Sequence, residues 1–517
     1  MSTKIARLGL FSRFGRLFRT VYATLIGARF DDMASRFDKI WHDTASRFDH
    51  IGRLMASRFD HFEHLMASRL DHIGQLVELE FVKNRKHELE AGSISFITQD
   101  SIARLNSGRP KAEPAIAVVA PMPPAKTGIA WYTFSSFRAA EYGVDIYAAY
   151  ETVDEYFNAI HDPRLANSNI RIFSAHTLPL GRMKNRYKAQ VFVIGNSNHN
   201  IHVGRALWHL TEFPVDLQTF VYIHDPCLFN IIDQLCFEFE LDFTNLLHRH
   251  YAEKLAYTPK KLDFRHQRAL VKRLIYGPKA LFNDIRIDGV IVNSQAAAEI
   301  VRKDFVEFDK AKIHKLFLPV FPLTVTCGVP RTDGRIRIGT FGVPAEAKST
   351  DVIVRAFREL RSKQPNVELL IAGYNAHDFG AKMGLLNERD IYLDDSPTIS
   401  HLMALMRSCD IAVQLRADSL GESSGVVPQL LALGTPTIVS RIGSFSEYGD
   451  AVAYAPRNIG PDQLADLILS ELKTKTPRTA ALENYVAQHS SALFCKQLMA
   501  LIEASGAREA EAMLRRR

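Results

Sequence analysis

Short apolar runs alternate with amphipathic helical segments over residues 115–470. Runs of this kind, bounded by Gly, Pro or polar residues, are typical of strands buried on both faces of a parallel sheet. The predicted strands are Ile116–Ala120, Val144–Ala148, Ile170–Phe173, Val191–Ile194, Thr219–Ile223, Val290–Ser294, Ile336–Phe341, Val367–Ala372, Ile391–Leu393, Ile411–Leu415 and Thr437–Ser440. The alternation predicts an α/β protein. Its interruption near residue 330 predicts two doubly wound, Rossmann-like domains, 115–330 and 335–470, that face each other across a cleft.

Residues 33–76 follow a different period. Four units of eleven residues succeed one another there, MASRFDKIWHD, TASRFDHIGRL, MASRFDHFEHL and MASRLDHIGQL. An eleven-residue repeat corresponds to about 3.67 residues per helical turn, so a nearly straight or right-handed bundle of several chains is expected. The bulky Phe59 and Phe62 on the apolar stripe favour three or four chains over two. We therefore predict that residues 28–90 form a long α-helical coiled coil that assembles a trimer or tetramer; the alternative is a helix folded back on its own globular domain.

Three further segments flank these regions. Residues 1–27 combine apolar residues at helical spacing with arginines, a pattern that suits either an anionic membrane surface or the start of the bundle. Residues 91–114 contain Gly, Ser, Pro and mixed charge and are predicted to be a linker. Residues 478–517 are predicted to be helical.

The composition is that of an ordinary globular protein. The 517 residues are 47% apolar and 23% charged, with a formal net charge of +7. The five cysteines form no CxxC pair, so neither a zinc site nor a disulfide framework is predicted. No transmembrane segment or signal peptide is apparent, and we expect a cytoplasmic protein, with peripheral contact at the inner face of the membrane as the alternative. No nucleic-acid partner is expected.

The stretch Asp410–Glu447 carries the most candidate chemistry. It predicts a strand, a loop over residues 416–425, a helix, a turn and a second strand. A loop that joins a parallel strand to a helix N-terminus is a usual place for an anionic ligand. Arg416 is suited to clamp phosphate oxygens, and Glu422 to accept hydrogen bonds from sugar hydroxyls. The segment Ser423, Ser424 and Gly425 leads into the helix and offers backbone N–H groups to the ligand.

A second loop has the same character. The predicted strand Ile336–Phe341 enters GVPAEAKSTD, in which Gly342 and Lys348 precede a helix. The order of strand, glycine loop, lysine and helix predicts a second anion-binding segment.

The first domain places polar residues after several of its strands. The loop PMPPAKTGIAWYT has Gly128 at its predicted helix start, where a ligand can approach the backbone. Asn196, His199 or His202, His224 and Asp225 follow two later strands. Because the carboxyl ends of parallel strands meet at one edge of a sheet, we expect these side chains to line the cleft.

Residues 410–447 resemble the nucleotide-sugar site of glycosyltransferase family 4, whose members have the GT-B fold. The match is to the subset with LR…GESSG motifs, which also has the "GNS…H" and "HD…L" segments. The resemblance implies a retaining glycosyltransferase that transfers a sugar from a nucleotide-diphosphate sugar to a glycan, lipid-linked or protein acceptor. It implies that Lys348 and Arg416 neutralise the leaving diphosphate, without a metal or other cofactor.

The same resemblance implies the other roles. Glu422 would orient the donor, Glu447 would hold ribose or sugar hydroxyls, and His224 and Asp225 would position the acceptor. The sequence departs from the family pattern at two places: Gln429 or Leu430 stands where a second glutamate is usual, and Val343 where an arginine is usual. Two alternatives remain open, a nucleotide-sugar epimerase of the GT-B fold and a coiled-coil scaffold with a degenerate GT-B module.

Overall fold

The computed structural model describes residues 112–516 except 151–152, 166–167, 185–186, 257–270, 272–273, 321–333, 396–397 and 475–477. All of them belong to the second of two compact units, Ala91–Arg517. The predictions for residues 1–27 and 28–90, and for nearly all of the linker, lie outside the described residues.

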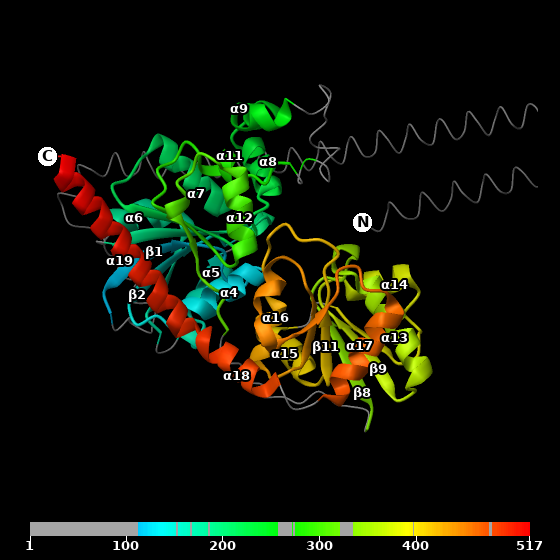
Figure 1. Cartoon of the computed structure of the whole chain (residues 1–517). Coiled ribbons are helices and arrows are strands. Elements are labelled where there is room, and N and C mark those ends of the chain that lie inside the picture. Colours follow the sequence, from blue (N-terminus) through cyan, green and yellow to red (C-terminus); the bar gives the residue numbers. More distant parts are fainter. Residues whose placement is uncertain are drawn as a thin grey trace, which may run out of the picture. The chain divides into compact units, whose positions relative to one another are not determined.

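The first domain is built on a seven-stranded parallel sheet in the order β3-β2-β1-β4-β5-β6-β7 (Figure 1). Its strands are β1 Pro114–Val119, β2 Gly143–Ala148, β3 Ile170–Ser174, β4 Ala189–Ile194, β5 Gln218–Ile223, β6 Gly289–Val292 and β7 Ile313–Lys315. Its helices are α4 Gly128–Phe137, α5 Val153–Ile160, α6 Leu178–Lys184, α7 Ile201–Glu212, α8 Phe229–Glu238, α9 Phe243–Leu255, α11 Pro278–Phe282 and α12 Gln295–Asp304. The strand order reverses beside β1, which is typical of a doubly wound sheet.

The second domain has a six-stranded parallel sheet in the order β10-β9-β8-β11-β12-β13. Its strands are β8 Ile336–Phe341, β9 Val367–Ala372, β10 Ile391–Asp394, β11 Ile411–Gln414, β12 Thr437–Ser440 and β13 Ala453–Ala455. Its helices are α13 Thr350–Lys363, α14 Ala376–Met383, α15 Ile399–Arg407, α16 Val426–Ala432 and α17 Pro461–Lys473, and short 3-10 turns include η6 Glu346–Lys348 and η7 Gly443–Glu447. The prediction of two parallel α/β sheets is confirmed.

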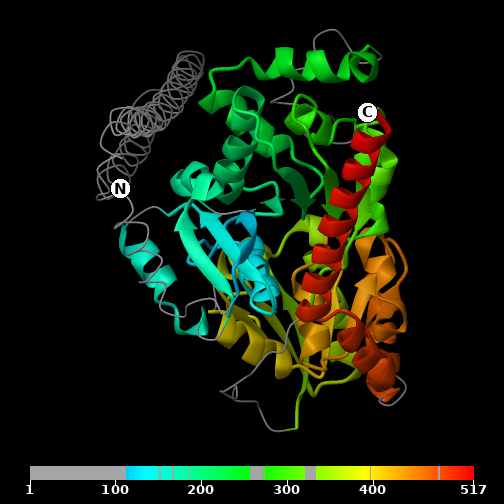
Figure 2. The same ribbon diagram turned by 90° about the vertical axis from the view of Figure 1, so that its left-hand side faces the viewer.

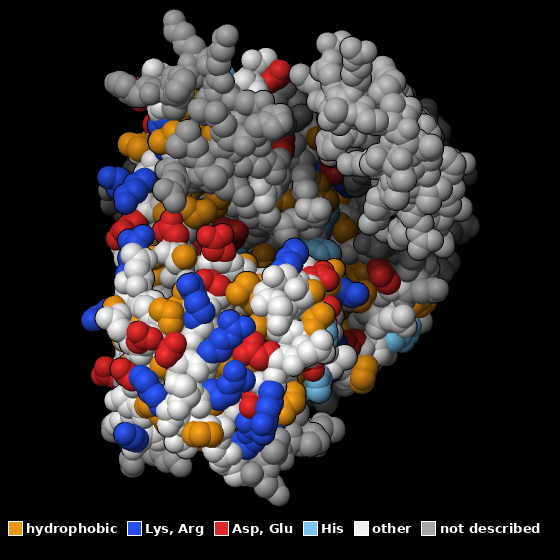
Figure 3. Space-filling view, turned by 90° about the vertical axis from the view of Figure 1, so that its right-hand side faces the viewer, with side chains coloured by type: hydrophobic (Ala, Val, Ile, Leu, Met, Phe, Trp, Pro, Cys, Tyr) orange, Lys and Arg blue, Asp and Glu red, His pale blue; other side chains and the backbone are white. Residues whose placement is uncertain are grey.

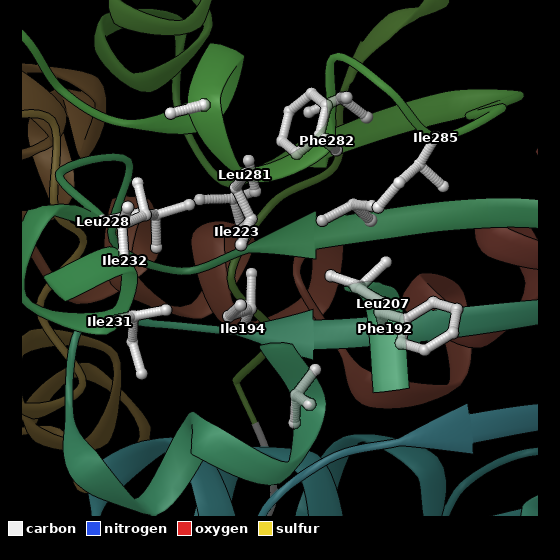
Figure 4. Packing of buried hydrophobic residues seen from close by; sticks show 14 of the residues in the cluster. Phe192, Ile194, Leu207, Ile223, Leu228, Ile231, Ile232, Leu281, Phe282 and Ile285 are labelled. Carbon is white, nitrogen blue, oxygen red and sulfur yellow. The ribbon is translucent and has the colours of Figure 1, made fainter. Parts of the chain in front are cut away.

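Apolar side chains fill both faces of each sheet. In the first domain, one face packs against α7, α8, α11 and α12, in a cluster that includes Phe192, Leu207, Ile231 and Phe282 (Figure 4). In the second domain, α13 and α17 cover one face through residues such as Phe357 and Leu464. These layers direct the carboxyl ends of the strands, and the loops that follow them, to one edge of each sheet.

The chain ends in two helices that lie on different domains. Helix α18, Arg478–Gln488, packs against α16 of the second domain, and α19, Ser491–Arg516, lies along the first domain (Figures 1 and 2). Phe494, Leu498 and Ile502 of α19 are buried in the first domain's core. The Tyr142 hydroxyl donates to the Cys495 carbonyl at 3.0 Å.

The face that carries α13 and α14 shows basic and acidic side chains interspersed (Figure 3). Several of them are paired, as Arg358 and Arg361 are with Glu388. Within the described residues, no helix is long and apolar enough to cross a membrane.

Candidate functional site

Two loops of the second domain meet at the carboxyl edge of its sheet. One follows β8 and contains Gly342 and Lys348; the other follows β11 and contains Arg416. The backbone N–H of Ala417 donates to the carbonyl of Ala347 at 3.0 Å, which joins the two loops directly. The structure therefore brings together two basic residues that are 68 positions apart in the sequence.

Lys348 lies over the turn that ends β8. Gly342 has φ +88°, and a Cβ built there would lie 3.0 Å from Lys348 Nζ, so the ammonium group rests against the glycine backbone. Burial and, to a smaller extent, the nearby Arg416 charge lower the pKa of Lys348 to about 8, while Glu422 acts in the opposite direction.

Arg416 is held from three sides. Its backbone N–H donates to Ser440 Oγ at 2.8 Å. Its Nη1 lies 3.4 Å from Glu422 Oε1. The guanidinium carbon lies 5.7 Å from the centre of the Phe445 ring, within the range of a cation–π contact. These contacts present the guanidinium next to Lys348.

The rest of the loop is shaped by its own hydrogen bonds. Glu422 Oε2 accepts from Leu420 N at 2.8 Å, and the Glu422 carbonyl accepts from Ser444 Oγ at 2.8 Å. Ser424 Oγ accepts from Val426 N at 3.2 Å and from Val427 N at 3.4 Å at the start of α16. Ser424 thus engages two backbone N–H groups at the start of α16, a capping interaction that short polar side chains favour. Ser423, between Glu422 and Ser424, is partly exposed.

The polar residues of the first domain follow its strands as expected, and several serve local structure. Asn196 Oδ1 accepts from Asn230 N at 2.8 Å and so caps the start of α8. Asp225 Oδ1 accepts from Cys227 N at 3.0 Å. His224 has its ring 4.4 Å from that of Tyr222, and burial lowers its pKa to about 4, so His224 is neutral at physiological pH.

The remaining first-domain candidates differ in exposure. Gly128 is exposed at the start of α4, and a Cβ there would meet no atom within 4 Å. His199 is exposed, whereas His202 is buried in α7.

Glu447 has a contact that the sequence did not predict. Its Oε1 accepts from Gln295 N at 2.7 Å, at the first residue of α12, and its Oε2 lies 3.1 Å from Lys315 Nζ. Both partners belong to the first domain. The structure therefore places this carboxylate in an interdomain contact, and its role toward ribose stays a prediction.

Four residues near the two loops were not identified from the sequence. Ser440, Ser444 and Phe445 hold Arg416 and Glu422, as described above. Tyr132 of α4 donates its hydroxyl proton to the Gly425 carbonyl at 2.8 Å. Tyr132 and Gly425 are 293 positions apart, and no local pattern signals such a contact. Over the described ranges, no group of three or more His, Cys, Asp or Glu side chains is placed to hold a metal ion.

Comparison with known proteins identifies the second domain. Residues 335–474 match the family model described as Glycosyl transferases group 1. No curated protein sequence is significantly similar to this chain.

Several solved structures are similar to this chain at low sequence identity. Sucrose-phosphate synthase from Thermosynechococcus elongatus is 16% identical, with a TM-score of 0.51 over 77% of this chain and 100% of its own. The trehalose-6-phosphate synthase OtsA is 11% identical, with a TM-score of 0.48 over 75% of this chain and 99% of its own. WaaG, a glycosyltransferase involved in lipopolysaccharide biosynthesis, is 14% identical, with a TM-score of 0.46 over 75% and 99% of the two chains. The two-sheet architecture is the GT-B fold that the sequence predicted. Residues 335–474 thus constitute a glycosyltransferase group 1 domain, which supports a glycosyltransferase activity for this protein.

Proposed function

We propose that this protein is a retaining glycosyltransferase that transfers a sugar from a nucleotide-diphosphate sugar to a glycan, lipid-linked or protein acceptor. The observation that carries the proposal is the pairing of Lys348 and Arg416. These two partly buried cations are close enough for Arg416 to lower the pKa of Lys348, and Glu422 is the carboxylate beside them. Two positive charges facing one negative charge suit an additional anion.

The chemistry follows from the charge that develops on the leaving group. When the bond between the sugar and the diphosphate breaks, negative charge grows on the diphosphate oxygens. Lys348 and Arg416 would stabilise that charge, and preorganised groups of this kind are worth more in a partly buried site than in water. The proposed transfer needs no metal ion at this step. Glu422 would orient the donor by accepting hydrogen bonds from hydroxyl groups.

The acceptor would approach from the first domain. His224 is neutral at physiological pH, so it can exchange hydrogen bonds with a hydroxyl group without adding a charge. Asp225 and the exposed Gly128 lie after strands of the same sheet and would complete the acceptor side. Retention of configuration is proposed by analogy with the resembling family, and no nucleophile is assigned.

A panel of nucleotide-diphosphate sugars tests the function. We expect one donor to bind and to be hydrolysed or used for transfer. Lys348→Ala and Arg416→Ala should each lower kcat/KM by about a hundredfold or more, because each removes a charge that stabilises the leaving group. Lys363→Ala and Arg355→Ala are matched controls, since both residues form exposed ion pairs on the second domain.

Three results would count against the proposal. Absence of binding to every nucleotide diphosphate would favour the scaffold alternative. Conversion of the donor sugar without transfer would favour an epimerase. Equal losses of activity and of folding in the Lys348 and Arg416 variants would contradict their assigned roles.

A further inference from the structure

The donor loop, residues 416–425, is held by the first domain as well as by its own. Leu420, near its middle, packs against the first domain's apolar core. Gly421 has φ +88°, and a Cβ there would lie 2.7 Å from side-chain atoms of Pro226 and Ile300. The middle of the loop therefore presses on the segment that follows β5 and on α12.

The end of the same loop has a second anchor. The Tyr132 hydroxyl donates to the Gly425 carbonyl at 2.8 Å, and a Cβ at Gly425 would lie 3.0 Å from Tyr132 Cε2. Tyr132 is 3% exposed, so packing around α4 fixes the donor, and the hydrogen bond itself is partly buried. Loss of a partly buried hydrogen bond of this kind weakens the fixation of the Gly425 carbonyl.

The two anchors bracket the residue that links the charges of the site. Glu422 lies between Leu420 and Gly425, accepts from Leu420 N, and forms the ion pair with Arg416. A shift of either anchor would move the Glu422 carboxylate and, through it, the guanidinium. The shape of the donor loop thus depends on a domain that contributes none of its residues.

We propose that Tyr132 is a positioning residue for donor binding, which acts through Gly425 by holding the donor loop in its binding conformation. The inference rests on the proposed function. If only a fraction of molecules has the loop in this conformation, the apparent dissociation constant for the donor rises in inverse proportion to that fraction. The bound complex is unchanged, so the effect falls on KM and not on kcat.

The test is Tyr132→Phe, which removes the hydroxyl group and keeps the ring. We expect the KM for the donor and the dissociation constant for its nucleoside diphosphate, measured by calorimetry, to rise about twofold to tenfold, with kcat within about twofold of wild type. The matched control is Tyr142→Phe, because the Tyr142 hydroxyl also donates to a backbone carbonyl, that of Cys495, at 3.0 Å. Tyr142→Phe should lower the melting temperature about as much as Tyr132→Phe does. It should leave the KM for the donor and the dissociation constant for the nucleoside diphosphate unchanged.

Leu420→Ala provides an independent variant, because it weakens the contact of Leu420 with the first domain's core. It should raise the KM for the donor and the dissociation constant for the nucleoside diphosphate. The proposal is overturned if Tyr132→Phe binds the nucleoside diphosphate as tightly as wild type, if Tyr142→Phe weakens binding equally, or if kcat falls while KM stays constant. Should Tyr132→Phe fail to fold, unchanged binding by Leu420→Ala overturns it. A wild-type protein that binds no nucleotide overturns the proposed function together with this inference, whereas normal binding by the wild type and by Tyr132→Phe overturns the inference alone.

Discussion

Lys348 occupies a position in the folded protein that disfavours its positive charge. Its ammonium group is partly buried against the Gly342 backbone and lies near Arg416. Both features disfavour the charged form, which is why its pKa falls from 10.5 to about 8. A bound diphosphate would reverse this preference by supplying negative charge.

The free energy of unfolding should therefore rise when Lys348 is replaced by Met. The folded state holds the Lys348 proton less tightly than the unfolded state does, so the penalty is fully present below pH 8 and disappears as the pH rises toward 10.5. We expect Lys348→Met to be more stable than wild type by about 1–3 kcal/mol at pH 7, and the difference to vanish near pH 10.5. Chemical denaturation of both proteins at several pH values measures this difference in the free energy of unfolding.

The affinity for a nucleoside diphosphate should depend on the charge of Lys348 in the opposite direction from the free energy of unfolding. Affinity of the wild type for a nucleoside diphosphate should fall as the pH rises through about 8, where Lys348 loses its charge. Lys348→Met should bind weakly at every pH. The exposed Lys363 provides the control, because Lys363→Met removes a surface ion pair with Asp466 and should leave binding and its pH dependence unchanged. A variant of Lys348 that is less stable than wild type at pH 7 would contradict the argument.

At the scale of elements, the turn from β8 into η6 joins strand geometry to the site. The strand Ile336–Phe341 is buried, and Gly342 reverses the chain at φ +88° so that Lys348 folds back over it. The apolar run and the glycine were visible in the sequence, and the predicted strand bounds agree with the structure. The short strands Ile313–Lys315 and Ala453–Ala455 were not predicted, and the first of them, IHK, contains a single apolar residue and so shows no apolar run.

Gly342→Ala tests this turn. An alanine at this positive φ is strained, which costs about 1 kcal/mol or more, and its Cβ would lie 3.0 Å from Lys348 Nζ. We expect a modest loss of stability and a larger loss of nucleoside diphosphate affinity, about tenfold. Gly384→Ala is the matched control: Gly384 has φ +70°, and a Cβ there meets no atom within 4 Å. Equal loss of affinity in both variants would show that strain alone is responsible.

At the scale of the whole molecule, contacts between residues distant in sequence join the two domains. Glu447 accepts hydrogen bonds from Gln295 and Lys315. Tyr132 donates one to Gly425. The two terminal helices pack in turn against α16 and into the first domain's core. The donor loop is therefore part of an interdomain structure as well as a segment of the second domain.

The eleven-residue repeat leads to a prediction on the same scale. Deleting residues 1–90 should reduce a trimer or tetramer to a smaller species, because the apolar stripe over residues 28–90 is the predicted contact between chains. Residues 91–517 form a compact unit, so donor hydrolysis should persist. Light scattering on the full chain and on the deletion variant decides the question. An unchanged oligomeric state would refute the coiled-coil assembly.

The sequence by itself determined the two parallel sheets and which polar and basic residues follow their strands. Apolar runs, glycine turns and a lysine or arginine in the following loop are local patterns, and burial of apolar surface leaves few ways to arrange them. Only the tertiary structure decided which partners these residues have. Ser424 caps α16, Asn196 caps α8, and Glu447 contacts the first domain. The hydrogen bond between Tyr132 and Gly425 was likewise decided only by the tertiary structure. The two residues are 293 positions apart, and no local sequence pattern encodes the distance between them in the fold.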